Sequence, residues 1–330
     1  MNYKFLILAA LLFGFGCAEA ADALNPVDIK EWTVSYGGRS RDPFAASANS
    51  VWFVGQSGHY LARLDAASGQ FTRTDLPDNP GPHNLIVGAD GIVWYSGNQA
   101  GYIGRYDPKT GGIEKIPMPD ARADDPHTLV MSKSGKHFWF TLQWGNFVGR
   151  LTIASRKVDL IPVTSGNARP YGITVAPDGT PWIALLGTDK LASVDPKTLK
   201  LTEHDVAPGA RPRRLDATRD GRIYYSDYRR GFLGRLDPKT GKTDEWKLPS
   251  GLGARPYALA VDARDRVWLV ETGPSPNNFV GFDPLRGAIT SITPIPSGAG
   301  SVRHMHYHQP SGAIWFGTDE NTIGRALVGK

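Results

Sequence analysis

The sequence predicts an all-β fold, a seven-bladed β-propeller in which an N-terminal strand closes the last blade. One phrase of roughly 40 residues recurs seven times, and its last copy stops before a fourth strand. Composition agrees, because aromatic residues make up 10% of the chain and it contains 38 glycines and 25 prolines. Such a composition is typical of a turn-rich β protein.

An aromatic residue holds the same place in every copy of the repeat. These anchors are Trp52, Trp94, Trp139, Trp182, Tyr224, Trp268 and Trp315. A second recurring place carries an arginine, usually after glycine, at Arg63, Arg105, Arg150, Arg235 and Arg325. A residue type that returns in nearly every blade is typical of packing between neighbouring sheets, not of one binding site.

Each copy divides into four short strands. The first follows a Pro-His or Pro-Tyr pair, as in PYGITVAP from Pro170, and the second carries the anchor. Asp90-Gly91 and its relatives suit a tight hairpin between these two strands. The segment DPKTG at 107–111 suits the turn between the third and fourth strands. A unit of four such strands is a propeller blade.

The last copy ends at Leu327-Val328, after its third strand. Residues 27–34, VDIKEWTV, alternate in the same way as the fourth strands TDEWKLP and GIEKIPMP of other copies. We therefore expect this segment to pair into the last blade, which closes the ring and removes exposed sheet edges.

Residues 1–20 are predicted to be a signal peptide, and residues 21–330 the propeller domain. Lys4 precedes an apolar run from Phe5 to Phe15, and Ala18-Glu19-Ala20 has the small-x-small pattern of a cleavage site. Cleavage after Ala20 predicts a periplasmic or secreted protein. Lipid attachment at Cys17 is an alternative, but Gly14 stands where a lipobox usually has leucine.

The cysteine content, net charge and apolar stretches of the chain exclude several classes of function. Cys17 is the only cysteine, so the mature chain has no disulfide, thiolate metal site or cysteine nucleophile. The net charge of +5 is scattered along the repeats, which argues against a nucleic-acid partner. No later apolar stretch is long enough for a membrane span. We expect a monomer that binds a small molecule in its central channel.

Function in a propeller is expected where the repeats differ, at the start of the innermost strands. Counting back from the anchors predicts one ring around the channel mouth: Phe44, His83, His127, Tyr171, Arg213, Tyr257 and His304. Most of these side chains form hydrogen bonds, which favours a ring that faces a ligand over one that only packs.

A second tier of arginines stands beside this ring. Arg169, Arg211 and Arg255 precede prolines, and Arg303 stands where the last copy lacks its proline. Guanidinium groups around one mouth favour an anionic or carbonyl-rich ligand. The alternative is a set of surface salt bridges between loops.

Asp227 and Glu271 are the two acidic residues three places after an anchor, in neighbouring copies. Their carboxylates suit one hard cation, Mg²⁺ or alternatively Ca²⁺ or Mn²⁺. The alternative is that one of them pairs with a nearby arginine. His304, His306 and His308 alternate along one strand, but a transition-metal site needs further ligands. The sequence has no GxSxG, P-loop or HExxH motif.

The phrases RPYGITVAPDGTPWIALLGTDKLASVDP and RPYALAVDARDRVWLVE resemble the repeats of the virginiamycin B lyase (streptogramin lyase) family. The resemblance covers nearly the whole mature chain and implies a seven-bladed propeller. It also implies an elimination that opens the ester of a cyclic depsipeptide. In that family a histidine is the general base, and Mg²⁺ held by glutamate stabilises the enolate-like charge.

In the sixth repeat the family has Arg-Pro-His followed by Trp-Phe-Thr-Glu, where this chain has Arg255-Pro256-Tyr257 and Trp268-Leu269-Val270-Glu271. The glutamate matches, but Tyr257 replaces the catalytic histidine. An unperturbed tyrosine is a poor base at neutral pH. His304, at another histidine position of the family, is the alternative base.

The sequence leaves three possible functions. The first is a metal-assisted C–O lyase, or less favoured a lactone hydrolase, with His304 as base, Glu271 and Asp227 as metal ligands, and Arg255 or Arg303 steering the carbonyl. The second is a non-catalytic exported propeller that binds an anionic, sugar-acid or peptide ligand at the same mouth. A protein-interaction scaffold is a third alternative.

Overall fold

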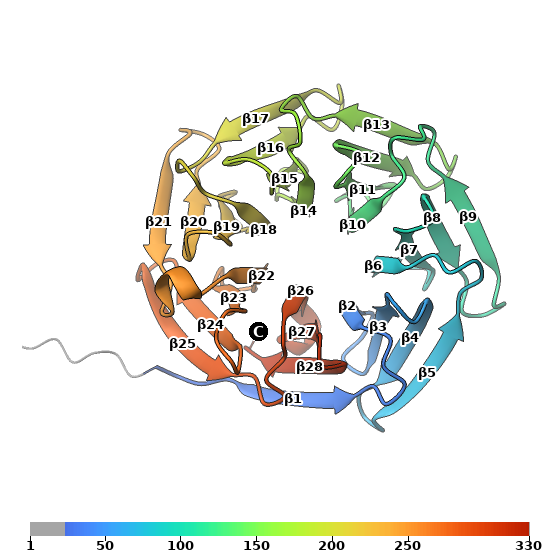
Figure 1. Cartoon of the computed structure of the whole chain (residues 1–330), viewed down its shortest axis with the longest axis horizontal. Helices are drawn as coiled ribbons and strands as arrows, with labels where there is room; N and C mark the ends of the chain where they lie inside the picture. Colours follow the sequence, from blue (N-terminus) through green and yellow to red (C-terminus); the bar gives the residue numbers. More distant parts are fainter. Residues whose placement is uncertain (1–23, 330) are drawn as a thin grey trace, which may run out of the picture.

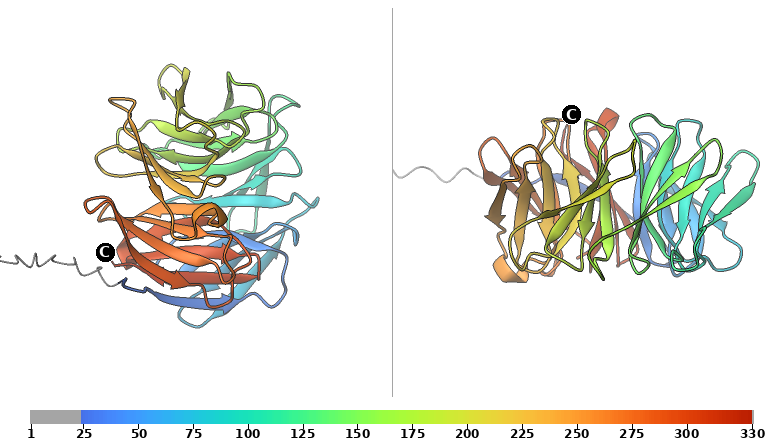
Figure 2. Two further views of the ribbon diagram at one scale, coloured as in Figure 1. Left: turned by 60° about the vertical axis from the view of Figure 1, so that its left-hand side comes forward. Right: turned by 90° about the horizontal axis from the view of Figure 1, so that it is seen from above.

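The computed structural model describes residues 24–329, so the predicted signal peptide and Cys17 lie outside the described part of the chain. Seven four-stranded antiparallel sheets stand radially around one axis (Figure 1). Seen from the side they form a flat, disc-like ring (Figure 2). The predicted seven-bladed propeller is confirmed. No helix between residues 24 and 329 is long and apolar enough to cross a bilayer.

The first four blades occupy residues 40–205. Their strands are β2 (Ser40–Ala45), β3 (Ser50–Gly55), β4 (Tyr60–Asp65) and β5 (Gln70–Asp75); β6 (Pro82–Val87), β7 (Val93–Gly97), β8 (Tyr102–Tyr106) and β9 (Ile113–Pro117); β10 (Pro126–Met131), β11 (His137–Leu142), β12 (Phe147–Thr152) and β13 (Val158–Pro162); β14 (Pro170–Val175), β15 (Pro181–Leu185), β16 (Lys190–Val194) and β17 (Leu201–Asp205).

The last three blades complete the ring. They consist of β18 (Pro212–Ala217), β19 (Ile223–Asp227), β20 (Phe232–Leu236) and β21 (Thr243–Lys247); β22 (Pro256–Val261), β23 (Val267–Glu271), β24 (Asn278–Asp283) and β25 (Ala288–Pro294); β26 (Val302–His308), β27 (Ala313–Thr318), β28 (Thr322–Leu327) and β1 (Asp28–Thr33). Two short 3-10 turns, η1 (Gly251–Gly253) and η2 (Gln309–Ser311), lie between strands.

The recurring aromatic anchors pack between blades, as predicted. Trp94 of one blade lies 5.2 Å from Phe138 of the next, within one buried cluster. Arg150 covers the Trp139 ring and pairs with Asp159 on the adjacent outer strand at 2.7 Å. These repeated residues therefore hold the sheets together.

The glycine before the recurring arginine has a packing role. In blade 2 a Cβ on Gly104 would lie 2.0 Å from the ring of Tyr95, which occupies that space. The same conflict occurs between Gly234 and Tyr225 in blade 5. Glycine is required here because a neighbouring aromatic ring approaches the backbone too closely for any side chain.

The ring closes through β1, as the incomplete last repeat predicted. Asp28 to Thr33 pair antiparallel with Leu327 to Thr322 of β28. The Trp32 ring stacks on the anchor Trp315 with a centroid distance of 5.6 Å. The last blade is thus built from both ends of the chain.

Candidate functional site in the central channel

Every inner strand carries a β-bulge near its start, after the first residue in six strands and after the second residue, Arg41, in β2. In β6, Pro82 pairs with Gly97 but Leu85 pairs with Tyr95, so two residues face one residue of β7. The same irregularity occurs in β2, β10, β14, β18, β22 and β26. A bulge changes the direction of side chains. Here the consecutive residues at the bulge of each blade point toward those of the other blades at the axis. Each blade therefore supplies two consecutive residues to the channel.

The strand pairing defines the first layer of channel residues, and it differs from the predicted ring at two places. The layer consists of Arg41, His83, His127, Tyr171, Arg213, Tyr257 and Arg303. Phe44, predicted for blade 1, instead pairs with the anchor Trp52 deeper in the channel. His304 lies one residue below Arg303, because the hairpin before Trp315 is one residue longer than its counterpart in blade 2.

The second layer forms a hydrogen-bonded network across the channel, which we call the axial network. Arg214 donates from Nη1 to Thr128 Oγ1 at 2.7 Å and from Nε to the carbonyl of Arg303 at 2.9 Å. Asn84 donates from Nδ2 to Asp42 Oδ2 at 3.1 Å. These contacts join five blades, and the side chains of Arg214, Asn84 and Asp42 are almost fully buried.

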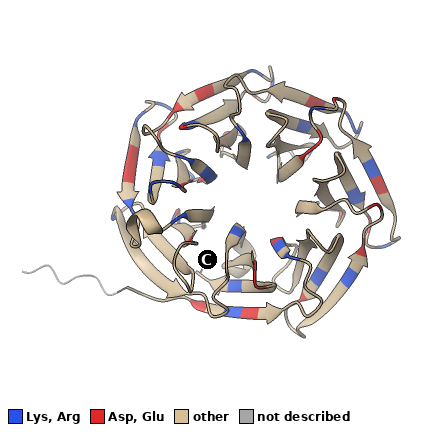
Figure 3. Cartoon of the chain, viewed as in Figure 1, with Lys and Arg blue, Asp and Glu red and all other residues tan. Residues whose placement is uncertain are grey.

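The two layers hold more positive than negative charge. The basic side chains are Arg41, Arg213, Arg214 and Arg303. Figure 3 shows the colour of Lys and Arg on the inner strands β2, β18 and β26. Asp42 pairs with Arg41 at 3.1 Å, and Asp319 pairs with Arg303 at 2.5 Å. Among residues 24–329, no carboxylate is bonded to Arg213. Nη2 of Arg41, Nη2 of Arg214 and Nε of Arg213 are buried without a hydrogen-bond partner within residues 24–329.

Such an excess of buried cations is costly unless an anion compensates it. Burial alone would raise the pKa of Asp42, but Arg41, His304 and Arg214 hold it well below its usual range. Asp42 is therefore ionised, and its negative charge is already included in the charge balance of the two layers. The arrangement favours a further negative group near Arg213.

Tyr257 is the protein group best placed to supply that charge. Its hydroxyl is hydrogen-bonded to the hydroxyl of Tyr171, and the Arg213 guanidinium lies 3.6 Å from its ring centre. Burial disfavours the phenolate, but the guanidiniums of Arg213, Arg214, Arg41 and Arg303 outweigh burial and lower the pKa of Tyr257 to about 8. Tyr257 is thus a stronger acid than an ordinary tyrosine.

The channel histidines are neutral. Burial and the nearby Arg41 lower the pKa of His83 well below its usual range, and burial with Arg214 does the same for His127. Burial lowers the pKa of His304, the predicted base, to about 4 although Asp42 opposes the shift. A base this weak is poorly matched to proton abstraction at neutral pH.

The oxygens of the predicted metal ligands are engaged within the protein, by loop hydrogen bonds in Glu271 and by loop hydrogen bonds to Oδ1 and an ion pair at Oδ2 in Asp227. Glu271 accepts from Ser250 N at 2.9 Å, from Ser250 Oγ at 2.6 Å and from Asn278 Nδ2 at 3.0 Å. Asp227 accepts from three backbone N–H groups, including that of Arg211 at 3.0 Å, and pairs with Arg230 at 3.2 Å. Within residues 24–329 no three His, Cys, Asp or Glu side chains are grouped as metal ligands.

The arginines before the inner strands surround the mouth outside the first layer. Arg211 and Arg255 are exposed, and Arg169 lies 4.1 Å from the ring centre of Trp144. Arg39 holds the same place in blade 1, which the sequence did not suggest because no proline follows it. Arg303, predicted for this tier, belongs to the first layer.

Trp144 projects from the loop between β11 and β12 beside these arginines. Its backbone N–H donates to Asp125 Oδ2 at 2.7 Å, and Gly145 N donates to Oδ1 at 3.1 Å. The loop is therefore held firmly while the Trp144 side chain remains 69% exposed. A fixed, exposed tryptophan offers a flat contact surface to a ligand.

A sequence profile of the virginiamycin B lyase family matches residues 156–329. The chain belongs to this family. A streptogramin B lyase structure is 22% identical in sequence to this chain and superposes on it with a TM-score of 0.80. The alignment covers 91% of this chain and 97% of the streptogramin B lyase chain. A catalytically inactive His-to-Ala variant of virginiamycin B lyase from Staphylococcus aureus with quinupristin is 21% identical, covers 91% and 99%, and has a TM-score of 0.81. No curated protein matches the chain.

The match to the family does not include all of the site residues that the sequence resemblance implies. At these identities the solved structures share the fold with this chain, and the residues decide the rest. The resemblance of the sixth repeat places Tyr257 at the family's histidine position, and four arginines lie around it. Its matching glutamate, Glu271, binds the loop at Ser250. The arginine-rich channel distinguishes this member.

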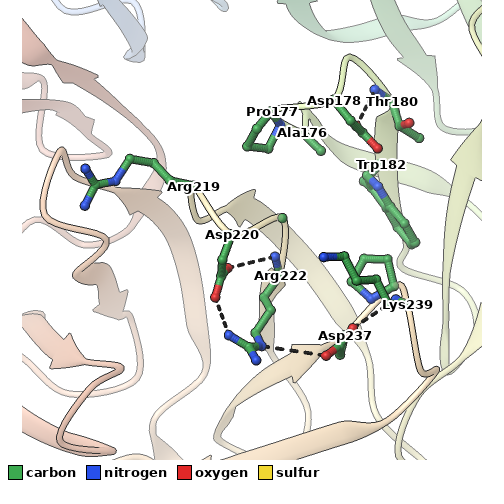
Figure 4. A pocket seen from close by; sticks show the side chains of 12 residues that line it. Ala176, Pro177, Asp178, Thr180, Trp182, Arg219, Asp220, Arg222, Asp237 and Lys239 are labelled. Atoms are coloured by element: carbon green, nitrogen blue, oxygen red, sulfur yellow. Dashed lines mark hydrogen bonds and ion pairs between the residues drawn. The ribbon is translucent and has the colours of Figure 1, made fainter.

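Another hollow, of about 400 Å³, lies between blades 4 and 5 on the opposite face (Figure 4). Of its two arginines, Arg222 is paired with Asp220 and lies 3.8 Å from Asp237, and Arg219 is paired with Asp265 at 3.0 Å. Because these charges neutralise one another, this hollow lacks the uncompensated charge of the channel.

Proposed function

We propose that this member of the virginiamycin B lyase family binds small organic acids at the arginine-rich mouth of its channel. One observation carries the proposal: four arginines meet at the two inner layers against the carboxylates of Asp42 and Asp319. A ligand carboxylate beside Arg213 supplies the missing charge, and a guanidinium fork suits its two oxygens.

The mouth also favours a ligand with a flat ring. Trp144 and Arg169 form a stacked pair at the rim, and Nε of Arg169 is buried without a hydrogen-bond partner in the described chain. An aromatic acid suits this rim, with its carboxylate held by the channel arginines and its ring against the exposed part of Trp144.

The binding test compares phenylacetate with phenylacetamide, which has the same shape without the charge, by isothermal titration calorimetry. Phenylacetate should bind, and Arg213→Gln should weaken it about tenfold or more because a charged hydrogen bond is lost. Arg63→Gln, on the exposed outer part of blade 1, is the matched control and should change nothing. Equal binding of the amide, or an unchanged affinity in Arg213→Gln, rules the proposal out.

A second candidate, lyase activity on the bound acid, is favoured by the lowered pKa of Tyr257. In an acid with an acyloxy group at the β-carbon, the Tyr257 phenolate removes the α-proton and becomes a phenol. The C–H electrons form the Cα=Cβ bond, the C–O bond breaks, and the acyl group leaves as a carboxylate. Arg213 and Arg303 stabilise the negative charge that develops on the substrate carboxylate. No metal takes part in these steps.

The activity test uses N-acetyl-O-acetylserine and a streptogramin B, and follows the conjugated double bond by ultraviolet absorbance. The rate should rise as the pH increases through about 8, because only the ionised Tyr257 is a base. Tyr257→Phe should lower kcat at least about 100-fold while phenylacetate still binds. A product without a new double bond, or a Tyr257→Phe variant with full activity, excludes this role.

The proposal includes export. The signal-like residues 1–20 support it, and mass spectrometry of the protein recovered from its native host should find a mature chain that starts at Ala21. An intact N-terminus would contradict export by this route.

A further inference from the structure

The far end of the channel contains a cavity of about 320 Å³, where the inner strands finish. All seven inner strands contribute to its wall, largely through aliphatic side chains such as Leu129, Ile173 and Leu259. The wall begins at His304 and includes none of the arginines of the axial network. The cavity therefore lies on the other side of this network from the mouth. Its size falls in the range of small-molecule sites.

The cavity has no free charge on its wall. Asp216, its acidic residue, accepts from Thr174 Oγ1 at 2.9 Å, from Ala217 N at 2.8 Å and, through its other oxygen, from Val261 N at 2.8 Å. Burial also raises the pKa of this carboxyl group. Both oxygens are thus hydrogen-bonded within the protein, and no basic side chain of the described residues lines the cavity to hold an anion.

His306 lines the cavity and carries a hydrogen-bond donor in a fixed orientation. Its Nδ1 accepts the N–H of Ala45 at 3.0 Å, and its ring stacks on Phe44 with a centroid distance of 4.1 Å. Burial and the neighbouring His304 and His308 lower the pKa of His306 to about 3. A neutral imidazole that accepts at Nδ1 carries its proton at Nε2. This Nε2–H has no partner within residues 24–329, and the ring cannot turn without losing its bond to Ala45.

We propose that this cavity binds a small, uncharged, mostly apolar molecule whose carbonyl oxygen accepts the Nε2–H of His306. The aliphatic wall stabilises the apolar part of such a ligand, since large apolar cavities accept small organic molecules readily. A fixed donor at one point of the wall sets the orientation of the carbonyl. The site is independent of the acid-binding mouth, because different residues form it.

The test measures binding of acetophenone and of ethylbenzene, which lacks the carbonyl, by ligand-observed NMR and calorimetry on the purified mature protein. Acetophenone should bind about fivefold more tightly than ethylbenzene, the amount expected for one hydrogen bond. His306→Phe keeps a ring over Phe44 and should remove that difference. No binding of acetophenone, or equal binding of both compounds to the unaltered protein, overturns the proposal.

A second pair of variants locates the site. Val130 is half-buried and lies on the cavity wall, so Val130→Trp should fill the space and abolish binding of acetophenone. Leu285→Trp, at a position that is 97% exposed and away from the cavity, should bind as the unaltered protein does. If Val130→Trp fails to fold, Met131→Trp on the same wall replaces it. Unchanged binding in a folded, filled variant contradicts the assignment.

Discussion

Glu271 illustrates how a residue that matches a family motif can have a different role. The sequence resemblance assigns it to the position of the family's metal-binding glutamate, yet Ser250 and Asn278 occupy its carboxylate oxygens. The side chain is fully buried and ties the turn around η1 to the end of β23. A buried carboxylate with several donors holds a loop in place.

Glu271→Gln should therefore lower stability to the same extent with or without Mg²⁺. Loss of a charged, buried hydrogen-bond acceptor is expected to cost about 2 kcal/mol. Thermal unfolding followed by circular dichroism checks this, with Glu320→Gln at the surface of blade 7 as control. A rise in Tm with Mg²⁺ that is lost in Glu271→Gln would instead support the metal site.

Single residues of the channel were only partly predictable from the sequence. Counting from the anchors placed His83 and Tyr257 correctly because their hairpins have the same length, whereas His127, whose hairpin is one residue longer, was marked by the preceding Pro126. Counting missed Arg41 and Arg303 because blades 1 and 7 lack the proline that marks the strand start, and the blade 7 hairpin is longer. A visible signal was present in Arg213-Arg214 and Arg41-Asp42, adjacent charges inside strands predicted to be buried.

At the scale of elements, β1 decides whether the ring is complete. Glu31 accepts from Ser297 N and Oγ, both at 2.7 Å, and from Thr322 Oγ1 at 2.5 Å. Together with the stacked Trp32, these contacts fasten the strand to blades 6 and 7. Without β1, the edge of β28 would be open to pairing with other molecules.

Removal of residues 21–34 should thus give a protein that associates or aggregates, as measured by light scattering. A synthetic peptide of residues 27–34 added in excess should restore the monomer and raise Tm. The same peptide with Trp32 and Glu31 replaced by alanine is the control. A truncated chain that stays monomeric and equally stable would contradict this role of β1.

The element order was predictable in full, because the repeat fixes the four strands of each blade and the missing strand identifies β1. The bulges were not, since nothing in a single inner strand marks where its pairing shifts. That shift decides which neighbouring residue faces the axis. The sequence therefore predicted the blades better than it predicted the contents of the channel.

At the scale of the whole molecule, the neutral histidines predict how stability depends on pH. The pKa values of His304 and His306 fall to about 4 and about 3 in the folded state, below the usual 6.5. The unfolded chain therefore binds more protons between pH 6.5 and 4, and stability must decrease as pH falls through this window.

Tm should fall by about 5 °C or more from pH 6.5 to pH 4.5. His304→Gln, which cannot be protonated, should show a smaller decrease. Scanning calorimetry at constant ionic strength measures both curves. A Tm that stays constant over this range would mean that the channel histidines are not buried as neutral groups.

The bulge in each inner strand has a consequence for how such proteins diverge. The residues that meet at the axis belong to the one stretch of each blade that is released from regular pairing, so exchanging them leaves the sheets intact. Selection can then remodel the channel while the blade framework persists, in keeping with a TM-score of 0.80 at 22% identity to a streptogramin B lyase. We expect new ligand specificities in this family to arise first at the two consecutive channel residues of each bulge.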